Sequence, residues 1–271
     1  MSLGIIFKGP EGITLAADSR VSLMAEFKKQ NRPTTLVPTT YDNATKLLRI
    51  NGQDFVGAVT YGLGVIGQKE PRTAHSYISE FEAELLKNGV GRLSVEEFTK
   101  RLSDFFIQQW KDKMPEDFKG PNMVFLVGGY DEEAPYGRAF EFDIPLKPEP
   151  IEHNIGMFGI VWGGQTEFTD RLIQGFDNNL INNVQKFLKI SDKEKEDLRE
   201  YLKKNSRTKI PFAFLPLQDC VDVSIFLIRT TIAIQNWMVG IRGVGGAIDV
   251  AVITRTEGFK PIQQKTIMGE R

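Results

Sequence analysis

The fold is decided by the stretch GITLAADSRVS at residues 12–22. It follows the apolar run Leu3–Phe7 and the turn-forming letters KGPEG at residues 8–12. Two short apolar runs on either side of a Gly- and Pro-containing turn predict a β-hairpin at the start of the chain. Symmetric pairing about this turn places Ser2 opposite Asp18, so we expect these two side chains to lie close together.

A second hairpin is predicted around the dipeptide Asn51-Gly52, which is the strongest short signal for a two-residue turn. The flanking strands are expected at residues 46–50 and 55–60. Registering them on that turn places Lys46 opposite Gly57. Both hairpins deliver their polar residues to one edge of a sheet, so Lys46 is expected near Ser2 and Asp18.

The remainder of the chain alternates between helical and extended patterns. Helices are predicted at 78–89, where apolar residues recur at helical spacing, and at 94–110, which a Ser-x-x-Glu capping box opens. A second capping box opens a charged helix at 191–204, and a long, mostly buried helix is expected at 217–239. Further strands are predicted at 122–128, 138–142, 155–162 and 247–254, a Pro-rich connector at 145–150 and an extended loop at 26–43. This order indicates an α+β protein in which helices are layered on antiparallel sheets.

The composition excludes several classes of function. The 271 residues carry 34 Lys and Arg against 35 Asp and Glu, a net charge of -1, so nucleic acid is not expected as a partner. The single cysteine, Cys220, excludes an internal disulfide and a Cys-rich zinc site, and no metal or organic cofactor is predicted. The first residues lack a basic signal-peptide region, and the most apolar stretch, 223–234, is too short and polar to span a membrane. A cytoplasmic protein is expected.

A glycine motif, GLGVIG at residues 62–67, fits the dinucleotide-binding pattern G-x-G-x-x-G. The rest of that unit is missing, because two helices follow it where a parallel strand ending in an acidic residue is required. We therefore interpret these glycines as a tight turn after a strand.

Ser2, Asp18 and Lys46 form the main catalytic candidate. A small residue after Met1 favours removal of that methionine, which leaves Ser2 with a free α-amine. An N-terminal hydroxyl residue can act as a nucleophile that uses its own amine as the proton acceptor. A lysine held by an aspartate beside the hydroxyl would lower its effective pKa through charge proximity.

Around these residues the sequence resembles the proteasome β-subunit branch of the N-terminal nucleophile hydrolases. The resemblance rests on GITLAADSRVS at 12–22, YDNATKLLRI at 41–50, and the segments 55–64 and 243–254. The spacing of the N-terminal residues is most similar to that of the bacterial ancestral β-subunit homologues. The resemblance spans most of the chain, and its specific motifs occupy about a quarter of it.

This resemblance implies a four-layer αββα sandwich of two antiparallel sheets flanked by helices. The whole chain, 1–271, would be one domain, with insertions around 23–43 and 165–216. Ser2 would be the nucleophile in place of the family's usual threonine, Asp18 would hold Lys46, Lys46 would tune the nucleophile, and the backbone N–H of Gly62 would stabilise the oxyanion. Peptides or unfolded proteins would be the substrates, and self-association into a ring or a helical stack is expected.

Two departures from the family pattern leave alternatives open. Residues Ile241-Arg242-Gly243-Val244 precede Gly245-Gly246 where the family has an aspartate and a serine, and Trp162-Gly163-Gly164 lacks the family's mid-chain serine. Those groups normally orient the nucleophile's amine. The alternatives are therefore a catalytically inactive assembly subunit on the same fold and an amidase that acts on small amides. A mature chain that retained Met1 would have no free amine on Ser2.

Overall fold

Five antiparallel strands form the first sheet of the computed structural model, which describes residues 2–27, 35–68 and 70–269. In sheet order they are β10 (Gly159–Gly164), β1 (Leu3–Lys8), β2 (Ile13–Asp18), β11 (Ile248–Thr254) and β12 (Gly258–Gln263). The predicted first hairpin is β1 and β2, and the predicted last strand is β11. Strand β12 was not predicted. The first strands of the chain therefore lie at the centre of a sheet that the last strands complete.

Five more antiparallel strands form the second sheet. They are β5 (Leu47–Leu48), β6 (Val56–Gly62), β7 (Met123–Gly129), β8 (Arg138–Ile144) and β9 (Lys147–His153), in that order. The prediction of a Pro-rich connector at 145–150 is wrong, because a short turn leads directly into β9. Proline is tolerated in β9 because it is an edge strand, one side of which needs no hydrogen-bond partner.

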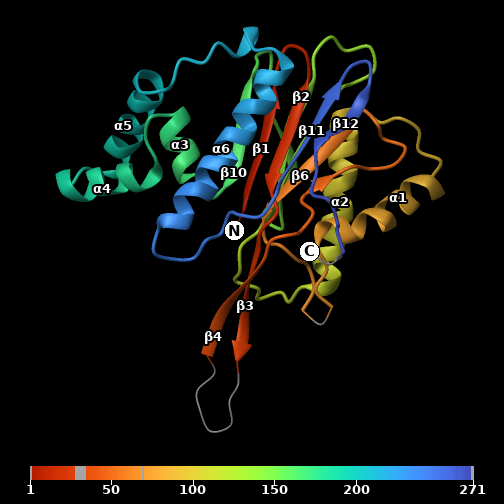
Figure 1. Cartoon of the computed structure of the whole chain (residues 1–271), viewed down its shortest axis with the longest axis horizontal. Coiled ribbons are helices and arrows are strands. Elements are labelled where there is room, and N and C mark those ends of the chain that lie inside the picture. Colours follow the sequence, from red (N-terminus) through yellow and green to blue (C-terminus); the bar gives the residue numbers. More distant parts are fainter. Residues whose placement is uncertain (1, 28–34, 69, 270–271) are drawn as a thin grey trace.

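A two-stranded hairpin projects from the body of the molecule (Figure 1). It consists of β3 (Val21–Phe27) and β4 (Thr35–Tyr41), paired from Val21 with Tyr41 to Phe27 with Thr35. The loop predicted at 26–43 is therefore wrong where the structure describes it. Pro38 lies within β4, which pairs on one side only, so the missing N–H of proline is tolerated there.

The two sheets pack face to face through a buried layer of aliphatic side chains. Alternate residues of β1 and β2, such as Ile6 and Leu15, meet Val59 of β6 and Leu126 of β7, and all four are fully buried. Their period of two is the reason that one face of each strand points into this layer.

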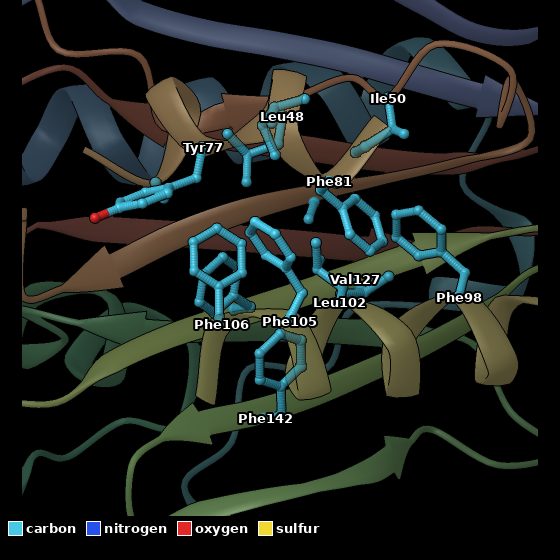
Figure 2. Close-up of a cluster of buried hydrophobic side chains, with 14 of the residues drawn as sticks. Leu48, Ile50, Tyr77, Phe81, Phe98, Leu102, Phe105, Phe106, Val127 and Phe142 are labelled. Atoms are coloured by element: carbon cyan, nitrogen blue, oxygen red, sulfur yellow. The ribbon is translucent and has the colours of Figure 1, made fainter. Parts of the chain in front are cut away.

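Helices α1 (Ile78–Lys87) and α2 (Val95–Lys113) cover the outer face of the second sheet. A short 3₁₀ turn, η1 (Ala74–Tyr77), precedes α1. Figure 2 shows the aromatic cluster that joins the helices to the strands, with Phe106 of α2 and Phe142 of β8 among its labelled rings. The ring centroids of Phe106 and of Phe125 of β7 lie 4.6 Å apart. Both helices were predicted from their apolar spacing, and Ser94 caps α2 by accepting the N–H of Glu97 at 3.2 Å.

Helices on the opposite side cover the first sheet (Figure 1). The long helix α6 (Leu217–Trp237) contacts β1, β2 and β11, and α3 (Glu167–Ile173) packs against α6. The prediction that α6 is mostly buried is only partly confirmed, because its residues Phe226 and Trp237 are exposed. The other elements here are α4 (Asn178–Leu188), which was not predicted, α5 (Asp192–Asn205) and the 3₁₀ turn η2 (Phe212–Phe214). The capping box predicted at Ser191 and Glu194 is present at the start of α5.

Both predicted hairpin registers are shifted. In the first, the N–H of Gly9 donates to the carbonyl of Gly12 at 2.9 Å, and Gly4 pairs with Ala17, so Leu3 rather than Ser2 falls opposite Asp18. In the second, a wider turn pairs Leu47 with Val59, which moves Lys46 opposite Thr60 instead of Gly57. Turn length sets register. The first turn has two residues, Pro10 and Glu11, between its paired glycines, whereas symmetric pairing about Pro10 assumes an odd number, and the second turn is wider than a two-residue Asn51-Gly52 turn.

The described chain is thus a mixed α+β structure with antiparallel sheets and helices, as the sequence predicted. None of its described helices is long and apolar enough to cross a membrane.

Candidate active site

Asp18 is the fully buried centre of the site, at the end of β2. One carboxylate oxygen accepts the backbone N–H of Leu3 at 3.0 Å, and the other accepts those of Arg20 at 3.1 Å and Gly245 at 3.0 Å. Three backbone donors therefore stabilise the charged form of Asp18 in a place without solvent. They also fix the start of β1 relative to the loop that precedes β11.

Lys46 is held by Asp18 in a buried ion pair. Its Nζ donates to Oδ1 of Asp18 at 2.7 Å and to the carbonyl of Arg20 at 2.5 Å. Burial lowers the pKa of Lys46 and the Asp18 carboxylate opposes that shift, while Lys265 and Arg20 add to the lowering. The ammonium is thus rigidly placed, with two of its three protons committed to the fold.

Ser2 lies at the entrance to β1 and is only 4% exposed. Its carbonyl accepts the N–H of Gln165 at 2.7 Å. The next residue along the chain, Leu3, is the one held by Asp18. The backbone on both sides of the Ser2 carbonyl is therefore fixed. The predicted removal of Met1 concerns a residue outside the described part of the chain.

Ser2 and Lys46 line one small cavity. Its volume is about 10 Å³, close to the smallest that holds one water molecule. Its lining combines the start of β3 and the loop before β5 with the end of β6, the segment after it and the start of η1. Besides Ser2 and Lys46, the lining residues are Val21, Ala44, Thr45, Thr60, Tyr61, Leu63, Gly64, Thr73 and Ala74. Burial, with the carboxylates of Glu141 and Asp143, raises the pKa of Tyr61 far above its usual range, so its hydroxyl stays protonated.

Gly62 ends β6 with a φ of +86°, and a Cβ there would lie 2.2 Å from the carbonyl oxygen of Asn122. Only glycine fits this turn. The N–H of Leu63 donates to Asn122, and that of Thr60 donates to the carbonyl of Lys46 at 3.0 Å. Because successive N–H groups of a strand alternate between its two edges, the N–H of Gly62 points to the edge that carries Lys46. Gly62 itself is not a lining residue of the cavity, although Tyr61 and Leu63 are.

A larger hollow adjoins the small cavity and shares Val21, Ala44 and Thr73 with it. Its volume is about 650 Å³, and Leu23 and Val65 make the wall largely apolar. Its lining also includes Asp42. Nε of Arg20 donates to Oδ1 of Asp42 at 2.5 Å, and Nη2 of Arg20 donates to Oδ2 at 2.7 Å. This hollow therefore has room for an apolar group next to the small cavity that Ser2 lines.

The structure therefore brings together three of the residues predicted from the sequence, Ser2, Asp18 and Lys46, and Gly62 follows on the strand edge that faces Lys46. The predicted route was wrong, however: the two hairpins lie in different sheets that face each other, and they do not share one sheet edge. Sequence reasoning missed the backbone groups of Leu3, Arg20 and Gly245, which carry no side-chain signal. It also missed Gln165 and Gln235. Gln235 does have a signal: it continues the buried face of α6 after Leu227, Ile228 and Thr231, and a glutamine at such a core position needs a partner.

The described residues contain no cluster of three or more His, Cys, Asp or Glu side chains that could hold a metal ion. No family model matches the chain, and a search of curated proteins found no match either. The functional argument therefore rests on the geometry of the site.

Proposed function

We propose that the protein is a peptidase of the N-terminal nucleophile class, with Ser2 as the nucleophile. The observation that carries this proposal is that Ser2 and Lys46 line one cavity while Asp18 holds both Lys46 and the residue after Ser2. A lysine ammonium fixed beside a terminal hydroxyl favours the alkoxide form of that hydroxyl. The succession of helices, two facing sheets and further helices supports the αββα sandwich of this class.

In the proposed reaction, Oγ of Ser2 attacks the carbonyl carbon of the scissile amide. The Oγ proton passes to the α-amine of Ser2, directly or through one water molecule. The carbonyl oxygen becomes an oxyanion, which the N–H of Gly62 stabilises. When the C–N bond breaks, the leaving amine takes the proton from the α-ammonium, and an ester on Ser2 remains.

Water completes the cycle. The α-amine accepts a proton from a water molecule as that water attacks the ester carbon, and the bond to Oγ then breaks to release the acid and restore Ser2. Lys46 contributes a fixed positive charge throughout and transfers no proton in this scheme. The neighbouring apolar hollow, with Leu23 and Val65 on its wall, would take an apolar side chain of a peptide substrate. Self-association into a ring or helical stack remains part of the proposal.

Intact mass measurement and one variant test this function. The purified protein should have the mass of a chain that begins at Ser2, and it should hydrolyse a fluorogenic peptide with an apolar residue before the cleaved bond. The variant Ser2→Ala should lose that hydrolysis, while Ser22→Ala, a matched change on the neighbouring hairpin, should retain it. A chain that keeps Met1, or an active Ser2→Ala protein, would contradict the mechanism.

The same assay separates the alternatives. Ser2-dependent hydrolysis of small amides without peptide cleavage would identify an amidase. A protein that begins at Ser2 and hydrolyses neither substrate would indicate an inactive assembly subunit.

A further inference from the structure

A pair of glutamines adjoins the two segments, 162–164 and 241–246, in which this chain lacks the amine-orienting groups of the family pattern. Gln165 follows β10 and Gln235 lies near the end of α6, 70 residues apart in sequence. Nε2 of Gln235 donates to Oε1 of Gln165 at 2.7 Å, and Oε1 of Gln235 accepts the N–H of Val244 at 3.0 Å. Gln235 is 8% exposed, so both of its hydrogen bonds are made away from bulk water.

These bonds belong to a connected hydrogen-bond network around the start of β1. The backbone N–H of Gln165 donates to the carbonyl of Ser2, and Gln235 links Gln165 to Val244. The next residue, Gly245, donates to Asp18, and Asp18 accepts the N–H of Leu3. The loop after α6 runs past the N-terminal end of β1 (Figure 1). Hydrogen bonds thus tie the start of β1 to the segment after β10, to α6 and to the loop before β11.

Gly164 makes the approach of Gln165 possible. Its φ is +102°, and a Cβ at this position would lie 2.0 Å from the carbonyl oxygen of Ser2. The backbone before Gln165 therefore lies directly against Ser2. Gln165 also falls opposite Ser2 when the register of β1 and β10 is continued past Leu3 and Gly164.

We propose that Gln165 and Gln235 are positioning residues for the nucleophile: the carboxamide of Gln165, held by Gln235, orients the α-amine of Ser2. This inference rests on the proposed function. A carboxamide can accept a hydrogen bond from an amine or donate one to it, so it can perform the orienting task without a charge. The charged and titratable groups around the amine are Asp18, Lys46 and Tyr61, and those that act on them are Arg20, Asp42, Glu141, Asp143 and Lys265.

The test is the pKa of the Ser2 α-amine in Gln165→Glu. A carboxylate at this position still accepts the hydrogen bond of Gln235, so the fold is preserved, and its negative charge favours the protonated amine. The pKa should rise by about one unit. The measurement is the pH dependence of acetic anhydride labelling, read from the mass of the N-terminal peptide of a chain that begins at Ser2. The acidic limb of the kcat/KM profile should move to higher pH by the same amount, because the amine acts in its unprotonated form.

Gln108→Glu, an exposed change of equal charge on α2, is the matched control and should leave the amine pKa unchanged. Gln235→Glu is the second variant. Its carboxylate lies one side chain further from Ser2, so a smaller rise of the amine pKa is expected. This variant also tests the proposal if Gln165→Glu does not fold.

An amine pKa in folded Gln165→Glu that equals that of Gln108→Glu would overturn the inference while leaving the proposed function intact. A chain that retains Met1 would overturn both. Because labelling does not require turnover, the positioning role is tested even in a protein that lacks peptidase activity.

Discussion

Two buried carboxylates, Asp18 and Asp170, differ in the charge and the sequence distance of their hydrogen-bond partners. Asp170 is 7% exposed and accepts hydrogen bonds from Nε1 of Trp162 at 2.8 Å, Oγ1 of Thr166 at 2.6 Å and Nε2 of Gln174 at 2.9 Å. All three partners are neutral and lie within eight residues of it in sequence. Asp18 binds a lysine and three backbone N–H groups.

Three of the four partners of Asp18 come from distant parts of the chain. Leu3, Lys46 and Gly245 are separated from it by 15, 28 and 227 residues. A local network of neutral donors, as at Asp170, holds one short helix to its neighbouring strand. A buried ion pair assembled from distant segments incurs a larger desolvation cost, which is a reason to look for function at Asp18 and structure at Asp170.

The largest expected effect is that of Lys46→Met. The variant should lose peptide hydrolysis by at least about 100-fold, because no cation remains to favour the Ser2 alkoxide. It should also lose about 3–5 kcal/mol of unfolding free energy, since the Asp18 charge stays buried without its partner. Peptide hydrolysis and urea unfolding measure the two effects.

A double variant, Asp18→Asn with Lys46→Met, separates them. Removing both charges should restore part of the unfolding free energy without restoring activity. Retained activity in either protein would place Lys46 outside the reaction.

Asp170→Asn should lower the unfolding free energy by less than Lys46→Met does, and it should leave peptide hydrolysis unchanged. The loss of one charged acceptor in a network of neutral donors should cost about 1–3 kcal/mol, measured by urea unfolding. The kcat/KM for the peptide should stay at the wild-type value. A loss of activity larger than the loss of folded protein would mean that Asp170 also serves the reaction.

Thr166→Val sharpens the comparison, because it removes one donor to Asp170 with little change in side-chain shape. The expected cost is about 1 kcal/mol of unfolding free energy, since a single hydrogen bond is lost and the carboxylate keeps two others. Thermal or urea unfolding of the variant measures it. An unchanged stability would show that water replaces the hydroxyl.

The smallest effect is expected from an exposed carboxylate, Asp42. The hydrogen bonds of Arg20 lower the pKa of Asp42 below its ordinary value of 3.8. A lowered pKa in the folded state contributes stability above the unfolded pKa, and that stability is lost as the pH falls through the folded pKa. Because the Asp42 side chain is 45% exposed, screening limits the contribution to less than about 1 kcal/mol.

A comparison of Asp42→Asn with the wild type measures this contribution. The difference in unfolding free energy should be constant between pH 5 and 7 and should shrink below pH 4. A difference that grows as the pH falls would contradict the assigned sign.

The elements with a clear period or cap were predictable, and those set by pairing were not. The helices α1 and α2 follow from apolar spacing, and the start of α5 follows from the capping box at Ser191. Strands β4 and β9 were missed because the prolines in them indicated loops. Each of these strands pairs on one side only, so proline is tolerated in it. The registers were missed because the first turn is centred between Pro10 and Glu11 and not on Pro10, and because the second turn is wider than the Asn51-Gly52 signal indicates.

For the site, sequence reasoning placed Ser2 and Asp18 on one hairpin and Lys46 on a second, because short separations and strand alternation act locally. The expectation that both hairpins meet at one sheet edge was wrong: β1 and β2 lie in one sheet and β5 and β6 in the other, so the packing of the two sheets brings Lys46 to Asp18. Only the tertiary structure decided that Leu3, Arg20 and Gly245 donate to Asp18 and that Gln235 reaches Gln165. Hydrogen bonds between backbone groups or across 70 and 227 residues depend on how the sheets and α6 pack, and no local pattern of side chains encodes that distance.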